Sequence, residues 1–477
     1  MKRILYWFRN DLRLHDNEGF SRAVQQADEV LPVFVFDPSR FTELPKLGFR
    51  KTDVFSANFL IESVTDLRRS LRNRGAHLVV RVGDPAKILA ELAGEIGAYA
   101  VYASKEVTHE ETDSESSLSR MLKPYNIDLE LFWQSTLYHV RDLPFDISRL
   151  PDVFSQFRSL VERQTKIRAT TEDPVRVKLV PEIDPGDMPS IATFGFPPEL
   201  KTDDRRAVPF KGGETTALER LQRYLWERGL IKTYKETRNE LLGEDYSSKF
   251  SAWLAYGCLS PRLIYEEVMR YEAERVKNES TYWLIFELLW RDYFRFVALR
   301  FGDRIFRQSG IRHDLSKRWL HDQNLFAKWT KGETGIPFID ANMRELATTG
   351  FMSNRGRQNV GSFLVKDLGI DWTWGAAWFE SKLVDYDPCS NWGNWNYVAG
   401  VGNDPRENRY FNIYSQATRY DQQGRYVKHW LPELADVPAP MVHMVSNLSH
   451  QEQKEYGVTL GDTYPKPLIN PNKWLKK

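Results

Sequence analysis

Two carboxylates, three side-chain amides and four aromatic rings occur together in the thirteen residues from Asp385 to Tyr397. Asp385 and Asp387 flank one tyrosine and precede Pro388. Because proline disfavours a helical conformation in the residue before it, we expect this part to be extended or turned. Two carboxylates placed in this way need Arg or Lys partners, or a heterocycle with imide and amine edges, such as a flavin or a base. A turn over an aromatic core is the alternative.

A second group of chemically useful side chains lies on a predicted helix over residues 281–301. Two indoles, one carboxylate and one guanidinium recur at i, i+4, i+7 and i+8, which places them on one face: Trp283, Glu287, Trp290 and Arg291. A Glu-Arg pair on an exposed face would stabilise the helix by only ~0.2–0.5 kcal/mol. A charged pair beside two tryptophans favours the lining of a pocket.

Hydroxyl groups gather in the run from Tyr246 to Ser251, directly before a predicted apolar helix over residues 252–259. Such groups can cap the helix, or they can join its free N–H groups in binding an anion. Lys249 within the run favours a phosphate.

A fourth group stands at i, i+3 and i+4 on one predicted helix face: Asn354, Arg357 and Gln358. Arg357 could pair with Asp385, which would leave Arg355 for a phosphate. A solvated polar helix start is the alternative.

The first 133 residues are predicted to form one of the domains that position these groups. Five β-rich apolar runs alternate with helical segments such as 54–74 and 85–96; the runs cover residues 3–8, 30–37, 77–82, 99–103 and 127–133. This alternation predicts a doubly wound parallel sheet of the α/β class. Ligands bind such sheets beyond the carboxyl ends of the strands, which favours residues 9–11 and 104–106. No Gly-x-Gly-x-x-Gly follows the first strand.

The remaining chain divides into a linker over residues 134–211, a helical domain over 212–430 and a proline-rich basic tail over 431–477. Seven prolines between Pro174 and Pro209 indicate a connector that lies on the surface. Helical periodicity dominates the third part, in segments 215–228, 260–277, 281–301, 336–348 and 354–366.

Composition sets the outer limits. At 477 residues the chain is too long for one core, and 42% apolar with 27% charged residues is typical of a soluble globular protein; the low cysteine count favours the cytoplasm. No apolar run approaches the ~20 residues that span a bilayer, so we expect no membrane partner. Two cysteines argue against a disulfide framework and against a thiolate metal site, and we expect no metal.

Four runs together resemble the photolyase and cryptochrome family: residues 7–17, 247–251, 353–358 and 391–397. Residues 401–406 and 410–412 resemble its DASH branch. The resemblance covers essentially the whole chain. It implies an antenna-bearing α/β domain, a long linker and an all-α domain that binds FAD in a folded shape.

The resemblance also implies roles for single residues. It predicts that four residues contact the FAD phosphates: Tyr234, Ser247, Ser248 and Ser251. Lys249, Trp283 and Arg291 are further candidates for cofactor binding. Four further residues would surround the ribityl chain and ring system of the FAD: Asn354, Arg357, Asp385 and Asp387. Asn391 would face flavin N5, where an amide that accepts from N5–H favours the reduced cofactor.

In this family, light-excited reduced flavin donates an electron to a cyclobutane pyrimidine dimer, which splits and returns it, so the cofactor carries the hard chemistry. Glu287 would stabilise the dimer, and three side chains would wall the pocket for a flipped lesion: Trp290, Gln358 and Tyr397. Electron transfer to the flavin during photoreduction would use Trp395, Trp372 and Trp319. Packing in the core would also explain tryptophan at these three positions.

Departures from the family pattern narrow the expectation. Duplex-repairing relatives have Trp at Tyr397 and Met at Gln358, whereas the DASH branch shares the residues found here and typically repairs dimers in single-stranded DNA. Six-four photolyases have His where Asn354 and Gln358 stand, which argues against that reaction.

Three further expectations concern ligands and signalling. A folate antenna, 5,10-methenyltetrahydrofolate, is expected, with Glu106 as its contact. Arg355 and Arg406 are candidates for DNA phosphates, and RNA is a possible second partner. A blue-light photoreceptor with little repair is the alternative function.

Overall fold

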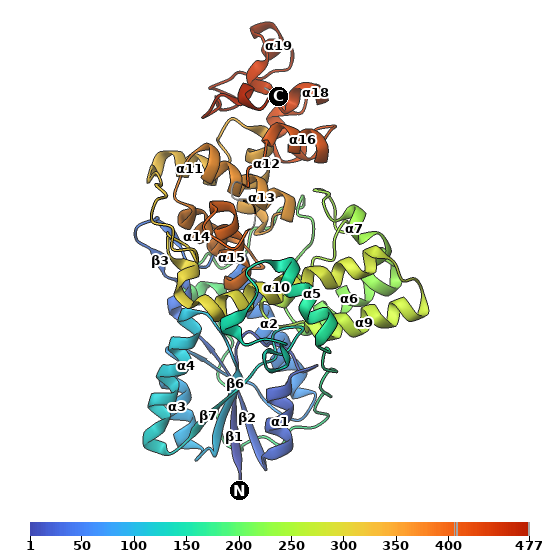
Figure 1. Ribbon diagram of the computed structural model, residues 1–477. Helices are drawn as coiled ribbons and strands as arrows, with labels where there is room; N and C mark the ends of the chain where they lie inside the picture. Colours follow the sequence, from blue (N-terminus) through green and yellow to red (C-terminus); the bar gives the residue numbers. More distant parts are fainter. Residues whose placement is uncertain (405, 407–408, 476–477) are drawn as a thin grey trace.

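A five-stranded parallel sheet forms the N-terminal domain of the computed structural model, which describes residues 1–404, 406 and 409–475 (Figure 1). The strand order is β5-β2-β1-β6-β7. The strands are β1 (Arg3–Phe8), β2 (Glu29–Phe36), β5 (Val79–Val82), β6 (Ala100–Ser104) and β7 (Asp128–Phe132). All four neighbouring pairs are parallel. A short antiparallel ribbon joins β3 (Glu43–Leu44) to β4 (Phe49–Arg50). The predicted doubly wound sheet is confirmed.

Alternation along the strands gives the sheet two buried faces. Leu5 and Trp7 of β1 pack in the core under α3 (Pro85–Glu95) and α4 (His109–Leu122). The intervening Ile4, Tyr6 and Phe8 belong to a larger core that includes the helical domain. Two helices pack on this second side: α1 (Glu18–Gln26) and α2 (Val54–Arg72).

The carboxyl edge of the sheet is filled by protein. Arg9 donates to Glu115 at 2.6 Å, and Tyr6 donates to Asp11 at 2.6 Å. Arg13 is buried and donates to the Gly257 carbonyl of the helical domain at 3.0 Å. Arg9, Asp11, Ser104 and Glu106 are buried at this edge, which the second domain helps to cover, so these side chains are not open to a ligand.

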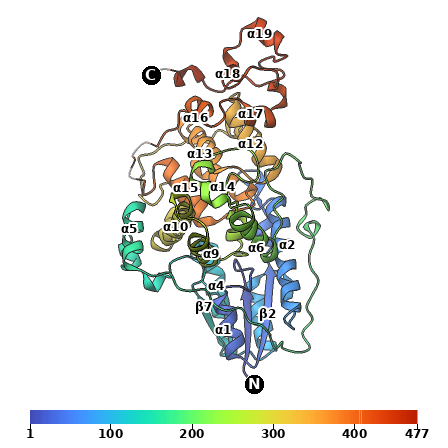
Figure 2. The same cartoon turned by 90° about the vertical axis from the view of Figure 1, so that its right-hand side faces the viewer.

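The connector is less irregular than its prolines suggest. It contains α5 (Phe154–Gln164) and several short 3-10 turns. Further along, it runs as an extended trace down the side of the sheet domain in Figure 2. Lys178 O accepts from Val30 N at 2.8 Å, so part of this trace is hydrogen-bonded to β2.

Helices build the rest of the chain, as predicted. They are α6 (Glu214–Gln222), α7 (Tyr234–Thr237), α8 (Ser251–Ala255), α9 (Pro261–Glu274), α10 (Glu279–Phe301), α11 (Gln323–Lys331), α12 (Pro337–Thr349), α13 (Asn354–Ser362), α14 (Trp372–Lys382), α15 (Pro388–Ala399), α16 (Ile413–Tyr420) and α17 (Arg425–Trp430). α6 and α13 continue as single π-helical turns at 223–227 and 363–367. α8 ends earlier than expected, because the chain turns at Gly257, which has a φ of +66°.

The C-terminal segment is folded rather than a free tail. It forms α18 (Ala439–Val442) and α19 (His450–Glu455) at the top of Figure 1. Tyr464 donates to Asp340 at 2.6 Å, and the Trp474 indole donates to Tyr410 at 2.6 Å. These contacts fasten the segment to the helical domain.

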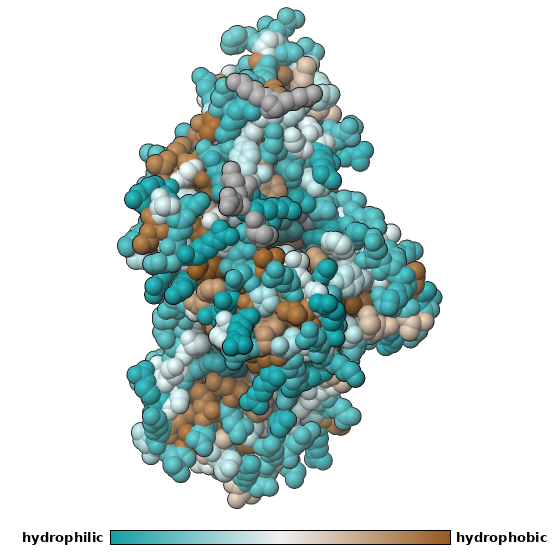
Figure 3. All heavy atoms as spheres, viewed as in Figure 1, coloured by the Kyte–Doolittle hydropathy of each residue, from teal (hydrophilic) through white to brown (hydrophobic). Residues whose placement is uncertain are grey.

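Hydrophilic residues cover most of the face shown in Figure 3, with apolar patches between them. Among the residues that the structure describes, no helix has both the length and the apolar character needed to cross a bilayer.

Candidate functional site

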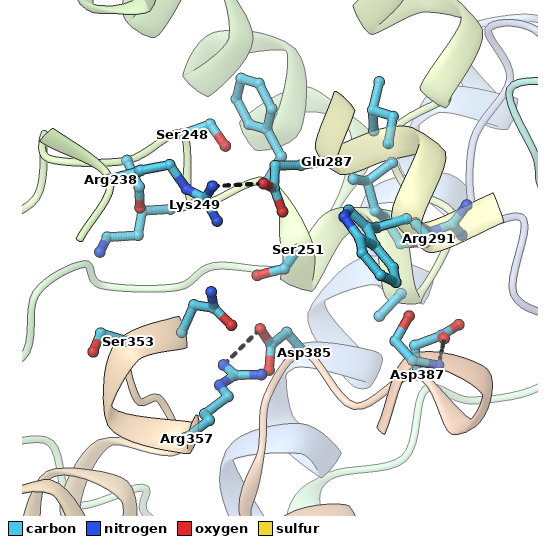
Figure 4. A pocket seen from close by; sticks show the side chains of 18 of the residues that line it. Arg238, Ser248, Lys249, Ser251, Glu287, Arg291, Ser353, Arg357, Asp385 and Asp387 are labelled. Atoms are coloured by element: carbon cyan, nitrogen blue, oxygen red, sulfur yellow. Dashed lines mark hydrogen bonds and ion pairs between the residues drawn. The ribbon is translucent and has the colours of Figure 1, made fainter. Parts of the chain in front are cut away.

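Two adjoining cavities of about 290 and 120 Å³ lie inside the helical domain. They share six lining residues and so form one continuous hollow: Asn354, Arg357, Asp385, Asp387, Ser390 and Asn394. We call this hollow the helical cavity. In Figure 4, Ser248, Lys249 and Glu287 lie on one side of it, and Arg357 and Asp385 lie on the other.

The hydroxyl-rich turn before α8 forms one wall. Ser247, Ser248 and Ser251 all line the cavity. Lys249 has a φ of +60°, a conformation that L residues adopt rarely, and its side chain is 3% exposed. Its Nζ lies 3.1 Å from the ring centroid of Tyr246 and has no hydrogen-bond partner among the described residues. Burial lowers the pKa of Lys249 well below its ordinary value. An anionic ligand would supply the missing partner.

Helix α10 supplies the second wall, and its charged residues pair differently from the expectation. Glu287 binds Arg238 with 2.7 Å between Oε1 and Nη1, whereas Arg291 donates to the Leu254 carbonyl at 3.2 Å. The Glu287–Arg291 pair considered as the alternative is therefore absent. Burial raises the pKa of Glu287, although Arg238 opposes this shift.

Two placements around α10 differ from the expectations. Trp283 does not line the cavity, because its ring stacks on Phe286 with 4.7 Å between centroids. Arg238 lines the cavity and was missed. Its spacing of four residues from Tyr234, which also lines the cavity, was the available signal.

The pair of Arg357 and Asp385 forms the opposite wall, as predicted. Nη2 of Arg357 lies 2.8 Å from Oδ2 of Asp385, and its Nε donates to the Met352 carbonyl at 2.9 Å. Oδ1 of Asp385 is buried and has no hydrogen-bond partner among the described residues. This oxygen can accept from a ligand N–H or O–H group.

The start of α15 places Asp387 and Asn391. Asp387 is the N-cap and Pro388 is the first helical residue, a position where the missing N–H of proline costs nothing. Oδ1 of Asp387 accepts from the Ser390 N–H at 2.7 Å. Nδ2 of Asn391 donates to the Ala376 carbonyl at 3.0 Å, so its Oδ1 remains to accept from a ligand.

Of the three side chains predicted to wall the pocket for a flipped base, two line the helical cavity. Trp290 and Gln358 line the hollow, and Trp290 stacks on Phe154 with 3.7 Å between ring centroids. Tyr397 is not part of this lining, and its ring centroid lies 6.0 Å from that of Trp290.

The two candidate phosphate ligands differ. Arg355 is not free of protein contacts, because it donates to Gln358 at 2.9 Å and to Asn239 at 2.8 Å. Arg406 is exposed.

The three tryptophans expected to carry electrons all lie in the helical domain, and they differ in burial. Trp395 lines the cavity and lies against α14 at Gly375, where a Cβ would come within 2.3 Å of its ring. Trp372 is the buried first residue of α14. Trp319 is partly exposed and precedes Leu320, which forms a bridge with Ile370 beside the start of α14. The ring centroid of Trp372 lies 5.8 Å from that of Trp392.

A larger cavity of about 860 Å³ lies between the two domains, and we call it the interdomain cavity. The sheet domain lines it with Arg40, Lys46, Lys51, Glu110 and Glu111, and the helical domain lines it with Glu380, Tyr386, Trp374 and Trp392, among others. Glu106, the expected antenna contact, is absent from this lining. It is 2% exposed and pairs with Arg295 instead.

Comparison with known proteins agrees with this architecture. Residues 4–177 match the family model described as DNA photolyase, and residues 283–477 match the FAD binding domain of DNA photolyase. The chain is 53% identical to "Cryptochrome DASH" of Gloeobacter violaceus over 98% of this chain and 93% of that protein.

Solved structures give the same result. A cryptochrome from Synechocystis sp. superposes with a TM-score of 0.96 at 50% identity and covers 100% of this chain and 98% of its own. A class III photolyase from Agrobacterium tumefaciens superposes with a TM-score of 0.85 at 28% identity, over 99% and 95% of the two chains.

Proposed function

The chain belongs to the photolyase and cryptochrome family, on its DASH branch, and from that premise we propose that it repairs cyclobutane pyrimidine dimers in single-stranded DNA under blue light. The observation that carries this proposal is the helical cavity. It combines groups suited to FAD with a partly buried carboxylate, Glu287, on the α10 wall.

The residues present fit FAD. The unpartnered Nζ of Lys249 and the three serine hydroxyls of the turn suit a pyrophosphate. The free Oδ1 of Asp385 suits a ribityl hydroxyl or a ring N–H, and Asn391 presents a carbonyl oxygen. When bound and reduced, the flavin supplies the light-driven electron.

The protein side chains then bind and orient the damaged bases. Glu287 is fixed by Arg238 and can hydrogen-bond to a dimer in the cavity, where low solvent access strengthens such a contact. Trp290 is rigid because it stacks on Phe154, and it offers a flat apolar face to the bases.

Gln358 in the cavity lining and Tyr397 next to Trp290 support a preference for single strands. Gln358 and Tyr397 are smaller or more polar than the Met and Trp of duplex-repairing relatives, so they offer less stacking to offset base flipping. A lesion that is already unpaired avoids the few kcal/mol that flipping takes from a duplex.

The interdomain cavity is our proposed site for the folate antenna. Its aromatic side chains can stack on a pterin, and Lys46 and Lys51 can bind carboxylates of the glutamate tail. Glu110, Glu111 and Glu380 line this cavity, and in place of Glu106 they would supply carboxylates for the pterin ring.

The test is repair of one defined thymine dimer, placed in single-stranded DNA and in the matched duplex, by the photoreduced protein under blue light. We expect repair of the single strand with little repair of the duplex. Equal repair of both would contradict the strand preference. No repair of either, with FAD bound and photoreducible, would contradict the enzymatic proposal and favour a photoreceptor.

A further inference from the structure

A buried ion pair joins the sheet domain to the wall of the helical cavity. Glu106 follows β6 and Arg295 lies on α10, with 2.8 Å between Oε2 and Nη1. Glu106 is 2% exposed and Arg295 is 4% exposed. The same guanidinium reaches Asp387, with 3.6 Å between Nη2 and Oδ2. Negative, positive and negative groups thus follow one another from one domain to the cavity.

Asp387 is the end of this series that faces the cavity. It lines both parts of the hollow and caps α15 through its bond to Ser390. Burial alone would raise the pKa of Asp387, but Arg295 and then Arg291 reverse the shift and lower it. Asp387 is therefore an anion whose charge depends on these two guanidinium groups.

Glu106 is itself held firmly. Its backbone N–H donates to Glu115 at 3.0 Å, and Glu115 in turn binds Arg9. Oε1 of Glu106 is buried and has no hydrogen-bond partner among the described residues. Burying a carboxylate with one oxygen that has no hydrogen-bond partner costs folding free energy, and the ion pair with Arg295 is the interaction that can offset this cost.

We propose that Glu106 is a positioning residue for the flavin: it holds Arg295, and Arg295 fixes the charge and orientation of Asp387 at the cavity wall. The inference rests on the proposed binding of FAD in the helical cavity. It gives the sheet domain a part in setting the redox properties of a cofactor that the other domain binds.

The physical reason is the balance of charge along the series. In the structure as described, Glu106 and Asp387 are the two carboxylates within ion-pair distance of Arg295. If Glu106 loses its charge, Arg295 has only Asp387 as a counter-ion, so the 3.6 Å separation should close. The Asp387 carboxylate would then turn from Ser390, and the cavity wall would gain one positive charge.

The experiment is a redox titration of the FAD-loaded protein with Glu106→Gln. We expect the midpoint potential of the bound flavin to shift in the positive direction, because added positive charge favours the reduced cofactor. The flavin absorption bands should shift as well. An unchanged potential and spectrum would overturn the inference.

Asp16→Asn is the matched control. Asp16 forms another buried pair between the domains, with 3.0 Å between its Oδ2 and Nε of Arg262, and it does not contact α10. We expect this variant to lose stability while its flavin potential stays that of the wild type. An equal shift in both variants would show a general effect of loosening the domains and overturn the inference.

A double-mutant cycle separates positioning from a direct field. If Glu106 acts through Asp387, then Glu106→Gln should shift the potential less in an Asp387→Asn background than in the wild type. Equal shifts in the two backgrounds would overturn the positioning role. If Glu106→Gln does not fold, Glu106→Met also removes the charge at similar volume and should shift the potential in the same direction; wild-type potential in Glu106→Met would overturn the role. Wild-type protein that fails to bind FAD would instead overturn the proposed function.

Discussion

The helical cavity and the interdomain cavity hold their charges in different ways. In the smaller helical cavity, the carboxylates of Glu287, Asp385 and Asp387 each meet a guanidinium from the same domain. In the larger interdomain cavity, Lys46 and Arg307 are exposed and have no acidic partner within 4 Å among the described residues. Lys51 is partly buried; it pairs with the exposed Glu110, and its Nζ lies 3.9 Å from Oε1 of Glu380.

This difference teaches what each cavity can bind firmly. Side chains fixed by ion pairs are ordered before the ligand arrives, so binding need not order them. Exposed lysines lose rotamer freedom on binding, which offsets much of their attraction. We therefore expect FAD to bind tightly in the helical cavity and the antenna to exchange more easily.

The largest effect is expected from Arg357→Ala, which leaves the Asp385 carboxylate buried without its cation. Removing one partner of a buried pair costs about 3–5 kcal/mol, and partial exposure of Arg357 favours the lower end, so FAD should bind about 100-fold more weakly. The FAD-to-protein ratio and the fluorescence of released flavin measure this. Arg344→Ala, which breaks the 2.7 Å pair with Glu433 outside the cavity, is the control and should keep its FAD. Wild-type retention in both would show that the pairs of the helical cavity do not hold the cofactor.

Glu287→Gln should separate substrate from cofactor within the helical cavity. We expect repair of a dimer in single-stranded DNA to fall about 10- to 100-fold, as for loss of one preorganised electrostatic group, with FAD content and photoreduction unchanged. Repair yield per absorbed photon is the measurement. Wild-type yield would remove Glu287 from the mechanism.

Two carboxylates have raised pKa values: Glu345, which is buried but lines neither cavity, and Glu380, which is partly buried in the lining of the interdomain cavity. Burial raises the pKa of Glu345 to about 7, although a 2.6 Å bond from Tyr426 and the nearby Lys249 oppose it; burial also raises the pKa of Glu380, in the interdomain wall, to about 7. Between pH ~4.3 and 7 the unfolded chain ionises Glu345 before the folded chain does, so the free energy of unfolding falls with rising pH.

Glu345→Gln removes this fall. Relative to wild type, the variant should gain up to about 3 kcal/mol at pH 8 compared with pH 4. Urea unfolding at the two pH values measures the gain. A difference between variant and wild type that does not change with pH would show that Glu345 is ionised in the folded protein.

Arg406→Ala and Arg355→Ala compare an exposed arginine with one that the protein already binds. Loss of a phosphate contact should weaken single-strand binding about tenfold and lower the salt dependence for Arg406. The effect should be smaller for Arg355, which already donates to Asn239 and Gln358. Fluorescence anisotropy at several salt concentrations measures both, and unchanged affinity in both would exclude them from the DNA interface.

The smallest effect is expected from Lys51→Ala in the interdomain cavity. A single charge contact near the surface contributes at most about 1 kcal/mol, so folate should bind no more than about fivefold more weakly, without loss of FAD. Equilibrium dialysis with the folate measures this. If Lys51→Ala weakened folate binding as much as Arg357→Ala weakens FAD binding, the proposed difference between the two cavities would be contradicted.

Local patterns sufficed for the elements and for part of the site. Period-2 and period-3.6 runs located the strands and most helices, and Pro388 marked the start of α15. The pair of Arg357 and Asp385 was predicted because each residue needed an opposite charge. The partner of Glu287 could not be predicted in the same way, since Arg238 lies in the turn after α7 and no spacing rule links the two residues.

The sequence by itself determined which segments are strands and helices and which side chains could serve a flavin, because propensity, periodicity and residue chemistry act within a few neighbouring positions. Only the tertiary structure decided where the sheet edge is covered, which ion pairs form and that Glu106 faces Arg295 rather than the interdomain cavity. Those choices depend on how the two domains pack. Burial and counter-ions between distant residues arise only when the chain has folded.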